Sequence, residues 1–194
     1  ECARLIAQDH HPEAIRSYKI RCTMSVTTFQ EIEHQVSNLD ATPQVKPTLS
    51  EMIAAVANTV SSGGMLNRIV LANLYVRTQD GREYFFELKT PTPNKVQCLE
   101  LMRRVLRIHA ARELSRPFVN AYYAMAYNPF GWDKADYTWE TTRQHTLFDE
   151  TVLIGEDFWN IIGGDGTYEK LIDIYREVTQ DYRQSLVGTV PFGF

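Results

Sequence analysis

The chain has 194 residues, of which 44% are hydrophobic and 23% are charged, and its net charge is -4. This composition excludes global disorder and supplies enough apolar material for one buried domain. The acidic balance argues against a nonspecific nucleic-acid binder, which is usually basic, and no apolar run approaches the ~20 residues of a membrane span.

The start of the chain and its cysteines indicate where the protein is located and whether its thiols are reduced. The chain opens with Glu1 rather than Met, so we expect that part of its N-terminus is missing. It shows no signal-peptide pattern, so we expect a soluble, cytoplasmic (prokaryotic) protein that has no contact with a membrane. Its three cysteines are far apart and include no CxxC pair, which indicates reduced, structural thiols rather than a zinc site.

The first sixty residues are expected to be helical. Residues 2–20 are predicted to form short helical pieces, and Pro12 suits the first position of one of them. Further helices are predicted at 25–36, which Ser25 can cap, and at 48–60, because apolar residues recur there at three- and four-residue spacing. The proline-containing segment 38–47 between them is polar and is predicted to be a loop.

The clearest pattern is a β-hairpin. Residues 69–77 and 82–90 are rich in Ile, Val, Leu, Tyr and Phe, which predicts two strands. If residues 79–81 form a three-residue loop with its glycine in the left-handed conformation, Thr78 faces Arg82.

This register has consequences further along the two strands. It places Asn73 opposite Glu87 and Leu71 opposite Lys89. A two-residue loop would instead place Asn73 opposite Leu88, on the other face of the sheet.

The second half of the chain alternates helices and strands. The predicted elements are a helix over 94–114 with Val96 among its inward residues, a strand over 118–127, an apolar run at 151–154, and helices over 156–162 and 168–185. The order of the elements predicts an α/β (mixed α+β) fold in which helices flank a central mixed sheet. We expect one domain over 1–194, with N-terminal helices (1–62), a catalytic core (63–127) and a C-terminal helical part (128–194).

The second strand of the hairpin carries the candidate chemistry. Glu87 and Lys89 are two positions apart, so their side chains share one face, while Leu88 points to the other. A carboxylate is a suitable ligand for a divalent cation, and a nearby lysine can stabilise a phosphoryl transition state or help to deprotonate the attacking water. The alternative is an ordinary charged pair on an exposed strand.

Phosphodiester cleavage with a metal ion usually needs a second acid. Asp80 lies at the tip of the hairpin, and at ~3.3 Å per residue it would be on the order of 20 Å from Glu87. Asp80 is therefore interpreted as a turn residue. The residue opposite Glu87 is Asn73, which can offer a carbonyl oxygen but no charge.

These residues resemble the PD-(D/E)XK nuclease fold. More narrowly, YFFELKTPTPNK (84–95) is similar to the TdeIII-type restriction endonuclease family, and AYNPFG (126–131) and LIGEDFWNIIGGDGTYEKL (153–171) fit the same family. The resemblance implies a type II enzyme that uses Mg²⁺ to cut both strands of double-stranded DNA at a short specific sequence.

The resemblance also implies roles for individual residues. Glu87 and Lys89 occupy the ExK positions, and Asn73 stands where the fold normally has its first acid. The implied metal ligands are Asn73, Glu87 and the backbone carbonyl of Leu88. An engineered inactive variant, a natural loss, and compensation by an early-helix acid such as Glu31 or Glu51 all remain open as explanations of Asn73.

DNA contacts are expected just beyond the motif. The stretch from Lys89 to Arg116 is basic, with seven Lys or Arg residues against two acids. Within it, the candidate DNA-binding residues are Asn94, Lys95, Gln97 and Arg103. Cutting two strands calls for two sites, so a homodimer is expected. Two other functions remain open, namely a DNA-binding module without chemistry and a structural interaction domain.

Overall fold

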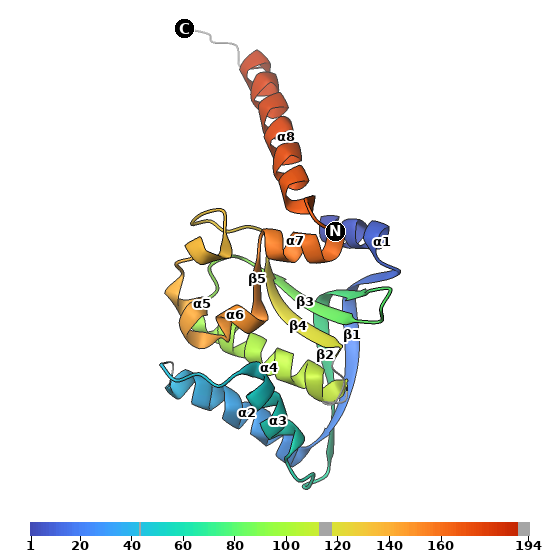
Figure 1. Cartoon of the computed structure of the whole chain (residues 1–194), viewed down its shortest axis with the longest axis vertical. Coiled ribbons are helices and arrows are strands. Elements are labelled where there is room, and N and C mark those ends of the chain that lie inside the picture. The colour runs from blue at the N-terminus through green and yellow to red at the C-terminus, as the bar shows by residue number, and fades with distance from the viewer. Residues whose placement is uncertain (43, 113–117, 190–194) are drawn as a thin grey trace.

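The computed structural model describes residues 1–42, 44–112 and 118–189. Within them, five strands form one mixed sheet in the order β1-β2-β3-β4-β5. The strands are β1 (Glu13–Ser25), β2 (Met65–Arg77), β3 (Glu83–Lys89), β4 (Val119–Met125) and β5 (Val152–Ile154). The first three are antiparallel, whereas β3, β4 and β5 are parallel. The predicted central mixed sheet flanked by helices is confirmed (Figure 1).

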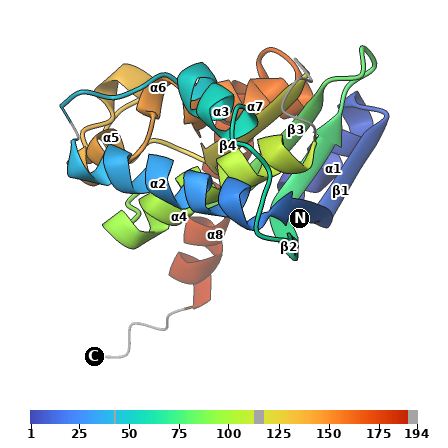
Figure 2. The same cartoon turned by 90° about the horizontal axis from the view of Figure 1, so that it is seen from below.

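One face of the sheet is covered by a layer of helices. Figure 2 shows α2, α3 and α4 close together in this layer. Its members are α2 (Val26–Ala41), α3 (Leu49–Ala57), α4 (Lys95–Ala111), α5 (Glu140–His145) and α6 (Phe148–Thr151). The larger hydrophobic core lies between these helices and the strands.

The other face is covered in part. A smaller core packs α1 (Cys2–His10), α7 (Glu156–Gly163) and the first turns of α8 (Thr167–Thr189) against the strands. A short 3₁₀ turn, η1 (Lys134–Asp136), lies in the segment between β4 and α5. The rest of α8 runs away from the sheet (Figure 1). Among the described residues, no helix combines the length and the apolar character that crossing a bilayer requires.

The hairpin has the predicted register. β2 and β3 pair through Arg77 with Glu83 and through Leu74 with Phe86. The Thr78 amide donates to the Arg82 carbonyl at 3.0 Å, and Gly81 has φ +84. The left-handed conformation of Gly81 closes the three-residue loop, and the loop length determines which face Glu87 takes.

The helical prediction for 2–20 is correct only for α1. Residues from Glu13 onward form β1, in which Ile20, Cys22 and Met24 are buried while the residues between them are exposed. This period of two is the signature of a half-buried strand, and it outweighs the proline-based helix signal. The structure therefore adds a strand at the edge of the sheet that was not predicted.

The other elements lie close to their predicted positions. Ser25 caps α2 by accepting a hydrogen bond from the Thr28 amide, although α2 continues to Ala41 into the predicted loop, of which residue 43 lies outside the described residues. α4 begins after its cap at Asn94, but Val96 is 73% exposed, so its predicted inward position is wrong. The predicted end of this helix falls in 113–117, outside the described residues.

Candidate active site

Glu87 and Lys89 lie at the end of β3, where the parallel strand β4 supports them from one side. Glu87 pairs with Tyr123 and Lys89 with Met125 in the register of these strands. The Glu87 side chain is only 7% exposed, whereas that of Lys89 is 43% exposed, and Lys89 Nζ lies 3.1 Å from Glu87 Oε1. The motif therefore combines a buried carboxylate with an ammonium group that reaches solvent.

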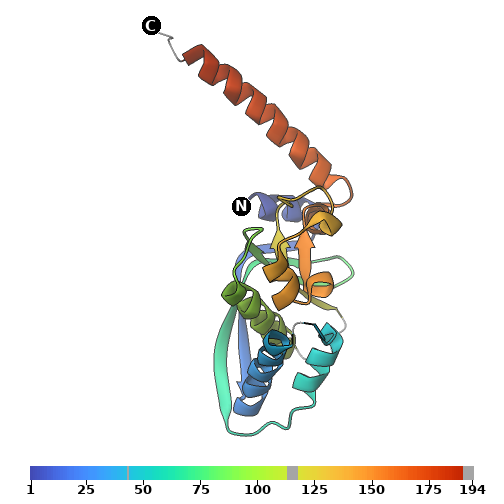
Figure 3. The same cartoon turned by 90° about the vertical axis from the view of Figure 1, so that its left-hand side faces the viewer.

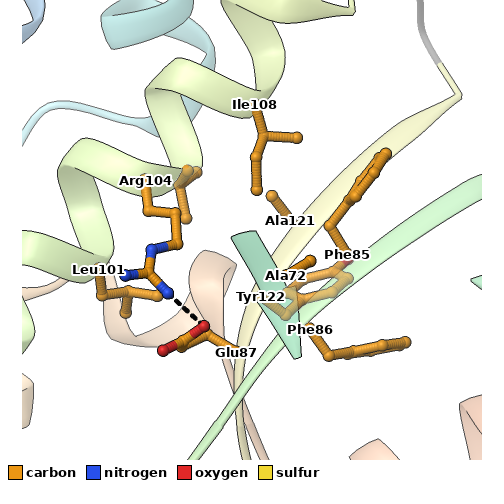
Figure 4. Close-up of a pocket in the computed structure, with 10 residues that line it drawn as sticks. Ala72, Phe85, Phe86, Glu87, Leu101, Arg104, Ile108, Ala121 and Tyr122 are labelled. Atoms are coloured by element: carbon orange, nitrogen blue, oxygen red, sulfur yellow. Dashed lines mark ion pairs between the residues drawn. The ribbon is translucent and has the colours of Figure 1, made fainter. Parts of the chain in front are cut away.

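Arg104 of α4 is the second cationic partner of Glu87. Its guanidinium forms an ion pair with Glu87 Oε2, and its Nη1 also donates to the Leu71 carbonyl at 3.3 Å. Figure 4 shows Arg104 reaching down from the helix to Glu87, with Leu101 beside the pair and Ile108 one turn further along. Because these surroundings are apolar, the carboxylate depends on its two cations for charge compensation.

A small pocket opens beside this ion pair. It has a volume of about 200 Å³, which suits a hydrated ion or a phosphate oxygen better than an organic ligand that must be enclosed. Its lining residues are Glu87, Lys89, Val96, Gln97, Glu100, Leu101, Arg104 and Tyr123. Two carboxylates, Glu87 and Glu100, therefore share one pocket with the lysine.

Tyr123 forms the β4 side of this pocket. Its hydroxyl donates to the Thr90 carbonyl at 3.0 Å, which holds the start of the proline-rich segment after β3. Burial raises the pKa of Tyr123 far above its usual value, and the nearby Glu87 acts in the same direction. Tyr123 is therefore a neutral hydrogen-bond donor that supports the segment.

Asn73 lies next to the motif, although its side chain does not line the pocket of Glu87. Its Oδ1 accepts a hydrogen bond from the Leu88 backbone amide at 2.8 Å, between the acid and the lysine. It lines a separate pocket that also includes Arg16, Ser17 and Leu88. The β2–β3 pairing ends at Leu74, and Ser17 across from Asn73 has φ 54, so the backbone is distorted here.

The metal-binding capacity of the site rests on few donors. Among the described residues, no group of three or more His, Cys, Asp or Glu side chains is arranged to hold an ion. Glu87 and Glu100 are the acids of the pocket, and the Leu88 carbonyl is adjacent in the chain. This set fits Mg²⁺, which often binds through one or two carboxylates and completes its shell with water and substrate phosphate.

The other acids considered from the sequence have local structural partners. Asp80 bonds to Thr78 and Arg82 in the loop, which confirms its interpretation as a turn residue. Glu51 accepts from Thr48 in the capping box of α3. Glu31 accepts from Gln35 on the surface of α2. None of these acids lines the pocket of Glu87.

The four candidate DNA-binding residues lie on α4 or at its start, and each has a partner within the chain. Asn94 and Gln97 form a reciprocal capping box, with both hydrogen bonds at 2.9 Å. Lys95 Nζ lies 2.8 Å from an oxygen of Asp40, and this hydrogen bond lowers the pKa of the Asp40 carboxyl. Arg103 Nε donates to Glu33 at 2.7 Å. Their contacts with DNA stay predictions.

Arg104 and Glu100 were not identified as site residues from the sequence. Both are part of the basic stretch, in which nothing distinguishes one charged residue from the next. Helical spacing offers the missing signal, because Gln97, Leu101 and Arg104 follow one another on the face that meets β3. Only knowledge that this face covers the ExK strand would have singled them out.

Comparisons with known proteins agree with a nuclease assignment. The family model described as "Type II restriction endonuclease, HinfI" matches residues 1–179. Relatives from Herpetosiphon aurantiacus are similar over 92% of this chain, namely the type II restriction enzymes HgiCII (45% identical), HgiEI (42%) and HgiBI (41%). The chain spans about two thirds of the length of these relatives, 66% of HgiCII and 65% of the other two.

The match decides the broad assignment and leaves the narrower ones open. The expected relationship to type II restriction endonucleases is confirmed, whereas the TdeIII-type and PD-(D/E)XK assignments stay predictions. The matched region includes all the elements that build the pocket of Glu87. The chain belongs to the HinfI family of type II restriction endonucleases.

Proposed function

We propose that this chain is the nuclease part of a type II restriction enzyme that hydrolyses phosphodiester bonds in both strands of double-stranded DNA at a short specific sequence. The observation that carries the proposal is the Glu87–Lys89 pair at the end of β3, in a chain of the HinfI family. The buried carboxylate and the exposed ammonium beside a small pocket suit PD-(D/E)XK chemistry, and the TdeIII-type resemblance of 84–95 agrees with it.

Each site residue has a chemical role in this proposal. Lys89 faces the pocket and stabilises the negative charge that develops on the attacked phosphate, or orients the attacking water. Glu87 binds the cation and helps to align the water. The Oδ1 of Asn73 accepts from the Leu88 amide and faces a separate pocket, so Asn73 positions the motif, and Leu88 contributes its backbone carbonyl. When bound, Mg²⁺ supplies Lewis-acid polarisation of the phosphate and lowers the pKa of the water.

Binding of the cation has to compete with interactions inside the protein. Both oxygens of Glu87 face cations, Lys89 on one side and Arg104 on the other. Asn73 adds no charge to offset them. We therefore expect weak affinity for Mg²⁺ without DNA, and tighter binding when a DNA phosphate supplies additional oxygens.

The decisive variant is Asn73→Asp. It keeps an oxygen that can accept from the Leu88 amide and adds one negative charge beside the motif. We expect Mg²⁺-dependent cleavage of mixed plasmid DNA to increase at least 10-fold. Replacing Glu87 by Gln or Lys89 by Met in that background should remove the gain, while Glu31→Gln should leave it. An Asn73→Asp protein that stays inert with Mg²⁺ and Mn²⁺ on varied DNA would rule out this site.

A second candidate function is a DNA-binding protein on the same fold without catalysis. The neutral Asn73 and the two cations that already compensate Glu87 favour it. Salt-dependent DNA binding without any effect of Mg²⁺, together with tolerance of Glu87→Gln, would support this alternative.

We also propose that the active form is a homodimer, because cleavage of both strands in one event requires two sites. Sedimentation of the full-length protein with and without a DNA duplex tests this proposal. A protein that remains monomeric on DNA while cutting both strands in one encounter would contradict it.

A further inference from the structure

The strands β1 and β2 extend beyond the rest of the sheet as a two-stranded ribbon. Lys19 pairs with Leu71, and Thr23 pairs with Asn67 and donates to it at 2.8 Å. The alternate residues of the ribbon are buried under α2 and α4, and Figure 3 shows α2 and α3 on one side of the strands only. The exposed side, which we call the ribbon face, consists of Lys19, Arg21, Thr23, Asn67, Ile69 and Leu71.

The ribbon face is positively charged. Within the part of the chain that the structure describes, neither Lys19 nor Arg21 has an acidic partner. The single acid of the two strands is Glu13, which lies at the far end of β1 and pairs with Arg77 at 2.9 Å. In a chain of net charge -4, two cations that form no ion pair among the described residues create a local positive field.

The ribbon face also exposes apolar surface between its cations. Ile69 is 66% exposed and Leu71 is 39% exposed, and they stand opposite Arg21 and Lys19. A second copy of the chain could cover apolar residues, but it would bring like charges together. Double-stranded DNA supplies the opposite charge, and its major groove is wide enough to admit a two-stranded β-ribbon.

The ribbon face is close to the ExK motif along β2, although the pocket of Glu87 opens on the α4 side of the sheet. Asn73 follows Leu71 on β2 by two positions, and its side chain is bonded to Leu88 inside the ExK motif. Ile69 and Asn73 are four positions apart, or about 13 Å along a strand. The ribbon face therefore ends near the strand that carries the ExK motif, on the side of the sheet opposite the pocket of Glu87.

We propose that the ribbon face binds double-stranded DNA. Lys19 and Arg21 contact backbone phosphates, and the exposed apolar residues between them approach the groove. The link to cleavage rests on the proposed function, whereas DNA binding by the ribbon can be tested without it.

The test is fluorescence anisotropy of a labelled mixed-sequence duplex with the full chain, in Ca²⁺ or EDTA, over a series of salt concentrations. The double variant Lys19→Gln/Arg21→Gln should weaken binding about 10-fold at moderate salt and reduce the salt slope by about two, since two phosphate contacts are lost. The matched control, Arg77→Gln/Arg176→Gln, removes the same charge from other exposed positions and should change the affinity less than about 3-fold. Thermal melting verifies that all variants fold.

The outcomes separate this proposal from the proposed function. Equal weakening by both double variants, or none by the ribbon variant, would overturn DNA binding at the ribbon face. Dissociation of a dimer by Ile69→Ser with unchanged DNA affinity would assign the face to a second copy instead. An Asn73→Asp protein that binds DNA through the ribbon face but does not cleave it would support DNA binding at the ribbon face and overturn the nuclease function. A protein that binds no duplex at low salt would overturn both.

Discussion

The two faces of one sheet use basic residues in different ways. Under α4, Arg104 pairs with Glu87, and Arg103 and Arg107 both pair with Glu33. On the ribbon face, Lys19 and Arg21 have no such partner among the described residues. The most basic stretch of the sequence is therefore largely neutralised inside the protein, while two inconspicuous cations on a strand remain available. The density of basic residues in a sequence does not locate a DNA surface when their acidic partners come from distant helices.

The largest effect on stability is expected under α4. Arg104→Met leaves Glu87 buried with one cation instead of two, and should lower the free energy of unfolding by about 3 kcal/mol. Arg103→Met is the matched control, and should cost about 1 kcal/mol or less because its partner Glu33 is 34% exposed. Denaturant unfolding measures both. Equal losses of unfolding free energy in the two variants would mean that the ion pairs under α4 are equivalent. If the double variant Glu87→Gln/Arg104→Met regains the lost free energy, the unpaired buried charge is the cause.

A buried histidine, His109, makes the stability of the folded protein sensitive to acid. Burial lowers the pKa of His109 from its ordinary value of 6.5 to about 4. Between these values the unfolded chain binds a proton that the folded protein does not bind, so stability present above pH 6.5 is lost as the pH falls toward 4. The loss amounts to about 3 kcal/mol.

Comparison of variants isolates this contribution from the carboxylates that titrate in the same range. His109→Gln should flatten the fall in unfolding free energy between pH 6.5 and 4. The exposed His34→Gln should follow the wild-type profile. Parallel profiles for all three proteins would contradict a neutral, buried His109.

The smallest expected change in the free energy of unfolding is on the exposed side of the ribbon. A buried residue of β1 and an exposed residue of β2 allow the two sides to be compared. Met24 is 4% exposed and belongs to the core, so Met24→Ala should lower the free energy of unfolding by about 2 kcal/mol. Ile69→Ala, on the exposed side, should change it by less than about 0.5 kcal/mol. A large loss at Ile69 would show that this side is covered in solution.

The sequence was sufficient to predict the hairpin and the helices around it. Strand composition and the left-handed Gly81 determine the register, and local caps such as Ser25 and Asn94 determine where helices begin. These features depend on neighbours in the sequence, which is why they could be predicted. The sequence prediction does not include the strand β1, because Pro12 favours the start of a helix, although alternation of buried and exposed residues follows it.

The composition of the site could be predicted only in part. Glu87 and Lys89 share a strand, so their common face follows from the alternation of side chains. Arg104 and Glu100 come from a helix whose rotation about its axis is set by the core. The partners of Arg103 and Lys95, Glu33 and Asp40, come from α2, and no local pattern connects them to α4. Contacts that form when distant elements pack together therefore cannot be predicted from local sequence patterns.

The Leu88 amide donates a hydrogen bond to Asn73, so the side chain at position 73 has to meet two separate requirements. The fold needs an oxygen acceptor at position 73, since an apolar side chain there would leave a strand amide unsatisfied. The proposed catalysis needs a negative charge at the same point. Asparagine and aspartate have nearly the same shape and both meet the first requirement, so exchanging one amide nitrogen for an oxygen changes the charge without disturbing the strand. Under the proposed function, a single isosteric substitution at position 73 separates binding of DNA from its cleavage, while the architecture stays the same.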